Sequence, residues 1–305
     1  MKKATISTLL LFAISKVSAA TVDVNADALY WYTTEIVDWS MNLDPKGNLE
    51  TVTFQKLSFD WAPGFRIGIG YTSSCDCWDT QFSYTHFQTK GANRAKGDMI
   101  KSEYFGSIFS GLGFYQQAKI RAKIEYNMFD WELGYLLCPS ECLFLRPVIG
   151  IKGGWIHQTL KTPLKKTFDI LNILFIPVKA EETLRNDFWG IGPKGGVNSK
   201  WFLSSCFSLV GDFSAALMWG HWSFSDQFLD SSGSNIVTKI ADRNFGAFML
   251  QGFLGLGLDI CNFSLKVGYE VQDWFNMYQV FDNGTGGQSG NLILQGIRFQ
   301  VRFDF

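Results

Sequence analysis

Residues 296–305 read GIRFQVRFDF, and this stretch decides the class of fold. Apolar residues occupy every second position from Ile297 to Phe305, and polar residues occupy the positions between them. Successive side chains of a β-strand point to opposite faces, so a strand here has one wholly apolar face and one strongly polar face. At the edge of a soluble sheet such a strand would promote aggregation. The stretch therefore predicts a strand with lipid on one side and a polar interior on the other.

The same alternation recurs along the chain. Four further stretches show it: FRIGIGY (65–71), IRAKIEYNM (120–128), WGIGPKGGVNSKW (189–201) and FSLKVGYEVQ (263–272). Their polar faces mix charged residues with glycines, which suits a polar interior better than an ordinary surface. Near Met128 the phase of the alternation changes, and FDWELGY (129–135) then resumes it. We interpret this change as a β-bulge, in which one extra residue shifts the alternation.

Residues 1–20 have the features of a secretory signal peptide. Lys2 and Lys3 form a positive n-region, residues 4–14 form an apolar core, and Ala19 and Ala20 end small-residue cleavage patterns. The apolar run is too short for the alternative, an uncleaved membrane anchor. Without this segment, which holds three lysines and no acidic residue, the formal net charge falls from −1 to −4. A nucleic-acid partner is therefore not expected.

The composition restricts the exported chain to two classes of protein. Aromatic residues make up 16% of the sequence and charged residues 18%, below the roughly 25% charged residues of a typical soluble domain. No later apolar run reaches the length of about eighteen residues that a membrane-spanning helix needs. A secreted soluble β-protein and an outer-membrane β-barrel both fit. Aromatic residues near the ends of the alternating stretches, such as Trp78, Trp201 and Trp274, favour the barrel, where they form interfacial girdles, over core aromatics of a large β-domain.

The connections between the expected strands alternate in length. We expect ten strands, at residues 27–39, 50–71, 78–89, 119–137, 143–161, 187–203, 207–224, 242–260, 263–280 and 291–305. Four connections are tight, at residues 72–77, 138–142, 204–206 and 261–262. Five connections are longer, at residues 40–49, 90–118, 162–186, 225–241 and 281–290. Short periplasmic turns and long outer loops are typical of outer-membrane barrels.

The sequence therefore predicts an all-β fold, a transmembrane antiparallel β-barrel over residues 21–305, closed by pairing of its first and last strands. A hairpin within 90–118 would raise the strand number to twelve. Residues 50–71 form either one bent strand or a plug-like piece followed by a strand. Residues 168–178 (FDILNILFIPV) are unusually apolar for a loop. They would fold over the lumen or contact a partner.

The polar faces of the strands are expected to line the lumen. The residues assigned to this lining are Arg66, Arg121, Lys123, Glu125, Arg146, Lys152, Lys194, Lys200, Asp212, Asp259, Lys266, Glu270, Arg298, Arg302 and Asp304, with Asp79, Asp130 and Glu132 facing them. The two signs of charge nearly balance, and opposite charges in a narrow barrel can pair and fill it. We predict a porin-like channel for small hydrophilic solutes or ions, with a disulfide-linked structural role in the envelope. The alternative is a closed structural or adhesive barrel that acts through its outer loops.

All six cysteines lie in or beside the tight connections: Cys75, Cys77, Cys138, Cys142, Cys206 and Cys261. We expect these connections in the periplasm, an oxidising compartment. Cys138 and Cys142 can close a small loop, whereas Cys75 and Cys77 are too near each other for an easy mutual bridge. Intramolecular bridges and bridges to other envelope proteins both remain open. The spacings match zinc sites poorly and no His lies nearby, so no metal is expected.

A barrel hydrolase is the least favoured alternative. Its candidate residues are His86, His157, His221, Asp226, Asp230 and Asp282, near the outer ends of strands or in outer loops. An Asp/His cleft at the mouth could activate water. The other interpretation is interfacial histidines beside aromatic residues, as at His221-Trp222. The sequence contains no hydrolase or P-loop motif, so neither enzymatic activity nor a cofactor is expected.

Three stretches resemble the pore-forming major outer-membrane protein family found in Legionella and Chlamydia-like bacteria. They are FDWAPGFRIGIGY (59–71), WDTQFSYTHFQT (78–89) and FWGIGPKGGVNSKWFLSSCFSLVGDFSAALMWGHW (188–222). Lys194 stands where that pattern has Arg, a departure that keeps the positive charge. The resemblance implies a porin-like barrel in the bacterial outer membrane, inserted by the barrel-assembly machinery through the terminal residues Phe303 and Phe305. The cysteine-bearing turns fit the chlamydial side, whose envelopes resemble disulfide-linked networks.

Overall fold

The computed structural model describes residues 21–35, 37–46, 49–73, 77–102, 114–170, 174–231, 233, 235–282 and 286–305. The expected signal peptide, residues 1–20, and Cys75 lie outside the described residues. Among the described residues, no helix is long and apolar enough to cross a membrane.

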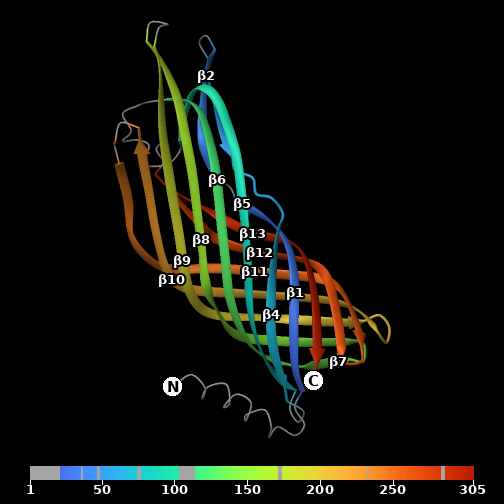
Figure 1. The fold of residues 1–305 in the computed structure, drawn as a ribbon. Coiled ribbons are helices and arrows are strands. Elements are labelled where there is room, and N and C mark those ends of the chain that lie inside the picture. The colour runs from blue at the N-terminus through green and yellow to red at the C-terminus, as the bar shows by residue number, and fades with distance from the viewer. Residues whose placement is uncertain are drawn as a thin grey trace, which may run out of the picture.

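Ten long antiparallel strands form a closed barrel (Figure 1). They are β1 (Thr21–Glu35), β4 (Ala62–Thr72), β5 (Trp78–Ser102), β6 (Tyr115–Tyr135), β8 (Leu143–Ile170), β9 (Leu174–Phe202), β10 (Phe207–Asp230), β11 (Asn235–Ile260), β12 (Phe263–Asp282) and β13 (Gly286–Asp304). β1 pairs with β13 from Asp23↔Asp304 to Glu35↔Leu292, so the first and last strands close the ladder. The expected ten-stranded barrel is confirmed.

Most of the expected long connections are extensions of the strands. β8 and β9 remain paired from Leu143↔Trp201 to Ile170↔Leu174. Residues 162–186 therefore belong mainly to a tall two-stranded ribbon, not to a loop that folds over the lumen. We call the end of the barrel with these ribbons the hairpin end, at the top of Figure 1, and the opposite end, with the short connections and the C-terminus, the turn end.

The expected strand at 50–71 is two strands. Residues 49–56 form β3 (Leu49–Lys56), which pairs with β2 (Asp38–Lys46) beside the hairpin end, and only β4 belongs to the barrel. Between them, Leu57 and Phe59 are buried in the interior. The segment between β3 and β4 therefore packs into the core and does not continue either strand. The short strand β7 (Leu137–Ser140) pairs with β8 at the turn end.

The polarity of the two faces inverts along the strands. On β8, near the turn end, Ile149 and Ile151 face outward with 65% and 41% of their surface exposed, and Lys152 faces inward. Toward the hairpin end, Lys161 faces outward and Leu160 is buried. The turn half therefore has an apolar outer face and a polar interior, as in a membrane span. The hairpin half has a polar outer face and an apolar interior, as in a water-soluble domain.

This inversion explains the change of phase near Met128. β5 and β6 pair without a register shift from Trp78↔Tyr135 to Lys96↔Gln117, so the β-bulge expected there is wrong. The side chains keep their strict alternation. The environment on the two sides of the strand changes instead, because the strand leaves the lipid there.

The inversion also corrects part of the expected lumen lining. Arg121, Lys123 and Glu125 lie beyond the change of phase, on the outer face of β6. Their neighbours Ile120, Ala122, Ile124 and Tyr126 point inward and are almost fully buried. The prediction that these three charged residues line the lumen is therefore wrong.

The hairpin half contains an extensive apolar core. Its largest fully buried side chains include Trp31, Trp39, Phe87, Tyr115, Tyr126, Phe188, Phe228 and Trp274. The side chains come from strands all around the barrel and form one contiguous cluster. The interior is therefore filled with packed side chains over this half of its height.

The inversion predicts different costs for two truncations on one strand. Leu160→Ala, inside the hairpin half, should lower the free energy of unfolding by about 2–5 kcal/mol because it leaves a cavity in a packed core. Ile149→Ala, on the lipid-facing side, should cost less than about 1 kcal/mol because lipid fills the space. Urea unfolding of the refolded protein in lipid vesicles, followed by tryptophan fluorescence, measures both. Equal costs would contradict the assignment of the two environments.

Candidate functional site: the ion-paired lumen

The interior of the turn half carries most of the charged residues assigned to the lumen. The structure places these side chains on the inner face: Arg66, Arg146, Lys152, Lys194, Lys200, Asp212, Asp259, Lys266, Glu270, Arg298, Arg302 and Asp304. They come from strands on all sides of the barrel. That they line a conducting pore stays a prediction, because most of them bind one another.

Two arginines and two carboxylates form the centre of the network. Arg66 Nη2 donates to Glu270 Oε1 at 2.8 Å, and Arg298 Nε donates to Asp27 Oδ2 at 2.7 Å. Arg66 also donates to the hydroxyl of Thr85 at 2.9 Å. The side chains of Asp27 and Glu270 have no exposed surface. The four charges therefore compensate one another across strands β1, β4, β12 and β13.

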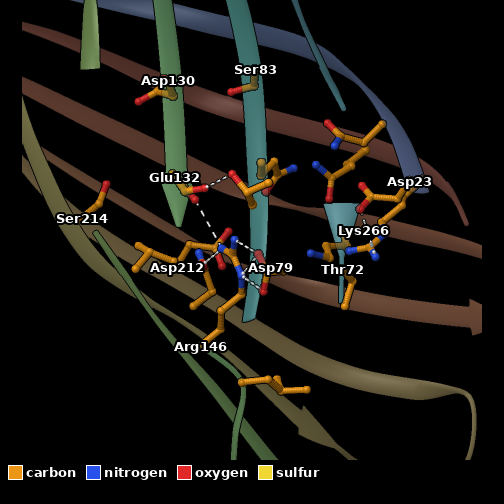
Figure 2. Close-up of a pocket in the computed structure, with 18 of the residues that line it drawn as sticks. Asp23, Thr72, Asp79, Ser83, Asp130, Glu132, Arg146, Asp212, Ser214 and Lys266 are labelled. Carbon is orange, nitrogen blue, oxygen red and sulfur yellow. Dashed lines mark hydrogen bonds and ion pairs between the residues drawn. The ribbon is translucent and has the colours of Figure 1, made fainter. Parts of the chain in front are cut away.

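A second cluster lies beside the first on β6, β8 and β9. Asp130 accepts hydrogen bonds from both Lys152 and Lys194, each at 2.9 Å. Lys194 also reaches Glu132 at 2.7 Å. Figure 2 shows this part of the lumen, where Arg146 bridges Glu132 and Asp79 nearer the turn end. A buried ion pair is favourable only when further hydrogen bonds satisfy the charged atoms, as they do here.

A cavity of about 540 Å³ lies between the clusters and the turn end. Its lining includes Ser73, Cys77 and Leu136 at the short connections, so the cavity reaches the turn end of the barrel. A neighbouring cavity of about 270 Å³, lined by Lys200, Asp259 and other residues, lies at the same end. We call the two cavities together the vestibule.

A layer of aromatic side chains lies in the interior above the ion pairs. The ring of Trp31 lies 5.3 Å from Phe87 and 6.4 Å from Tyr126, and Tyr126 lies 5.9 Å from Trp274, measured between ring centroids. All four side chains have no exposed surface. The ammonium group of Lys152 lies 6.0 Å from the ring of Trp274, so the charged and aromatic layers are in contact. We call this layer the aromatic seal.

A chain of polar side chains crosses the apolar core of the hairpin half. Gln158 donates to Glu35 at 2.6 Å, and Asn186 donates to Gln158 at 2.8 Å and to the carbonyl oxygen of Met277 at 3.2 Å. Burial raises the pKa of Glu35 to about 8. The sequence analysis missed these residues. The signal was their place at inward positions among apolar neighbours, as for Gln158 between Ile156 and Leu160.

The three histidines lie on the outer face of the barrel. His157 Nδ1 lies 2.8 Å from Asp187, on exposed surface, and His86 Nδ1 lies 2.7 Å from Asn127. His221 also faces outward, whereas Asp226 and Asp230 on the same strand face inward and are buried. The side chain of Asp282 lies outside the described residues. Among the candidate side chains that the structure describes, the histidines therefore face outward and the aspartates inward, and they form no common Asp/His cleft.

The cysteines and the terminal phenylalanines lie at the turn end. The five described cysteines, Cys77, Cys138, Cys142, Cys206 and Cys261, are free thiols on exposed surface. Phe303 and Phe305 face outward with 48% and 76% of their surface exposed, and the Phe305 amide donates to the carbonyl oxygen of Val22 at 2.8 Å. Disulfide bonds and the assembly signal stay predictions. Within the described residues, no group of three ligating side chains could hold a metal ion.

A family model matches almost the whole chain. Residues 17–305 match the family model described as Legionella pneumophila major outer membrane protein precursor. No curated protein matches the chain. The outer membrane protease OmpT from Escherichia coli is similar at 13% identity and a TM-score of 0.45, covering 95% of this chain and 99% of that chain. A major outer membrane protein from Thermus thermophilus is similar at 12% identity and a TM-score of 0.36, covering 94% and 100%.

The second cluster predicts that loss of a buried carboxylate lowers the stability more than loss of an exposed carboxylate at the rim. Asp130→Asn should lower the free energy of unfolding by about 3–5 kcal/mol, because it leaves Lys152 without its carboxylate in a buried position. Asp304→Asn, at the rim with 33% of its side chain exposed, should cost less than about 1 kcal/mol. Urea unfolding in lipid vesicles compares them. A cost for Asp130→Asn as small as that of the rim variant would refute a tightly coupled cluster.

Glu35 predicts a dependence of stability on pH. The folded pKa of about 8 exceeds the ordinary value of 4.5, so between these values the folded state holds a proton that the unfolded state has lost. Stability should therefore fall as the pH rises from about 5 to 8, by at most about 1.4 kcal/mol per pH unit. Glu35→Gln should remove this component. Unfolding of both proteins measured across this range tests it, and identical pH profiles would contradict it.

Proposed function

We propose that this chain, which belongs to the Legionella major outer membrane protein family, is a closed structural barrel of the bacterial outer membrane. The aromatic seal carries the proposal. Trp31, Phe87, Tyr126 and Trp274 have no exposed surface and belong to a contiguous cluster of buried side chains that strands all around the barrel contribute. A barrel filled in this way gives solutes no continuous aqueous path, in keeping with the general rule that small barrels are filled by side chains.

The charges beneath the seal support the same proposal. An ion that passed between Arg66 and Glu270, or between Arg298 and Asp27, would have to separate groups that are paired and buried. Breaking a buried pair leaves an uncompensated charge and costs about 3–5 kcal/mol. The network therefore holds together the four consecutive strands β4, β1, β13 and β12 on one side of the barrel.

The hairpin half supports a role outside the membrane. Its apolar core makes it a packed extension of the barrel. We place it on the outer side and the short turns in the periplasm, following the usual arrangement of such barrels. Residues 1–20 as an export signal and Phe303 and Phe305 as an assembly signal fit this placement. The exposed thiols at the turn end would then be available for bonds to other envelope proteins.

A porin-like passage is the second candidate, and the vestibule favours it. A cavity of about 540 Å³ with charged walls enters the barrel from the turn end, as a channel entrance would. Passage of small hydrophilic solutes or ions would require the aromatic seal to move. An enzymatic role has less support, since the histidines lie on the outer face, apart from the vestibule.

Planar-bilayer conductance separates the two candidates. The refolded wild-type protein should give no discrete steps, because the seal blocks the lumen. Trp31→Ala/Trp274→Ala, which removes two indole rings from the seal, should give steps. Trp189→Ala removes a lipid-facing indole that is 58% exposed and should stay silent. Retained heat-modifiable migration on gels shows that each variant is folded.

The opposite result would favour the porin-like candidate. Wild-type steps whose ion preference changes in Arg298→Gln/Arg302→Gln would mean that solutes pass beside these inner-face arginines. The closed-barrel proposal would then be wrong.

A further inference from the structure

A group of cations covers the outer face of three adjacent strands in the hairpin half. We call it the basic wall and define it as Lys90, Arg94, Lys119, Arg121, Lys161 and Lys165. Arg94 lies directly opposite Lys119 on the neighbouring strand, and Arg121 lies directly opposite Lys161. Residues opposite each other in a sheet have Cβ atoms about 5 Å apart, and like charges in such pairs are destabilising. The repulsion between these cations is therefore unfavourable, and a bound anion would reduce it.

The protein itself does little to neutralise the basic wall. In the part of the chain that the structure describes, none of the six residues forms an ion pair with an acidic side chain. Nearby Glu125 binds Lys123, and Asp187 binds His157. The charges of Arg121 and Arg94 lower the pKa of Lys119, which shows that repulsion at its position on the outer face is not compensated. These cations are therefore available to an external polyanion.

An apolar groove of about 460 Å³ lies on the outer face of the same strands, nearer the turn end. Its walls are formed by Phe82, Phe129, Trp131, Ile151 and Ile191. Gly153 lies in its floor, where a Cβ atom would approach Ile191 to 3.2 Å. The groove belongs to the lipid-facing band, so a hydrocarbon chain can occupy it.

We propose that the groove and the basic wall together bind one acylated, anionic glycolipid of the outer leaflet, the lipopolysaccharide. An acyl chain would lie in the groove, and phosphate or carboxylate groups on the sugars would contact the wall. Along β6, Arg121 lies eight residues from Phe129, or about 26 Å at roughly 3.3 Å per residue. The wall thus begins above the hydrocarbon region, at the level of the saccharides, and it faces sideways into the leaflet.

The combination favours this ligand over two simpler ones. A soluble polyanion would use the wall and leave the groove aside. A phospholipid would fill the groove, but its single phosphate lies near the hydrocarbon boundary and does not extend along the wall. A lipid whose anionic headgroup rises well above its acyl chains matches both surfaces at once.

Binding to the refolded full mature chain in detergent micelles tests the proposal. The probe is purified lipopolysaccharide without O-antigen, and phosphatidylglycerol and heparin serve as comparators. Lys161→Glu should weaken lipopolysaccharide binding at least about tenfold at low salt, because each cation near an anionic surface contributes substantially to affinity, and the difference should shrink at high salt. Lys239→Glu, an equal charge reversal at an exposed lysine on β11, should leave the affinity unchanged.

A second pair of variants tests the groove. Gly153→Leu should fill it and weaken lipopolysaccharide binding several-fold without changing heparin binding. Gly252→Leu places the same side chain on β11, where a Cβ atom meets no neighbour, and should behave as wild type.

Stability without ligand separates a binding role from a structural one. Lys161→Glu places a carboxylate opposite Arg121 and should leave the thermal midpoint unchanged or raised while binding falls. A lowered midpoint with unchanged affinity would overturn the proposal. Equal affinity of Lys161→Glu and Lys239→Glu for lipopolysaccharide would also overturn it. If the binding of heparin depended on the basic wall and that of lipopolysaccharide did not, the wall would be a site for a soluble polyanion. The proposal of a lipid ligand would then be wrong.

Discussion

Along the long strands of this barrel, the environments of the inner and outer faces change from the turn half to the hairpin half. The rest of the structure depends on this change. In the turn half the outside is lipid and the inside is polar. In the hairpin half the outside is water and the inside is an apolar core. The closed ladder satisfies the backbone hydrogen bonds of the strands within the lipid, and most strands stay paired with a neighbour in the hairpin half. The polarity of the side chains then determines which face of a strand points to the interior at each level.

The polar interior of the membrane half is stable because its charges are matched and its walls are close. Asp27 and Glu270 have no exposed surface, yet each contacts arginines from neighbouring strands. Glycines on the inner face of β4 provide the space that these side chains require. A Cβ atom at Gly68 would lie 2.7 Å from the Asn25 amide oxygen. The alternation of glycine with isoleucine in 65–71 therefore reflects both surfaces of the strand, the crowded lumen and the lipid.

Sequence periodicity predicted the closed ten-stranded barrel well, and it predicted the inner face well only within the membrane half. A period of two fixes which residues share a face, but it does not say which face is inside. For Lys266 and Arg298 the apolar face is outward, so the polar residues point into the lumen. For Arg121 and Lys123 the apolar face is inward, so these polar residues point away from the interior. The change of phase near Met128 was a local sign of this reversal, and a bulge would give the same sign.

One stretch of β6 contributes both to the apolar core of the hairpin half and to the cations on its outer face. Because Ile120, Ala122 and Ile124 fill the core of the hairpin half, the alternating positions Lys119, Arg121 and Lys123 must point outward. If these cations pointed inward, the apolar side chains that now fill the interior would have to point outward. The cations of the hairpin half therefore point sideways, away from the barrel, and the packed interior is what places them there.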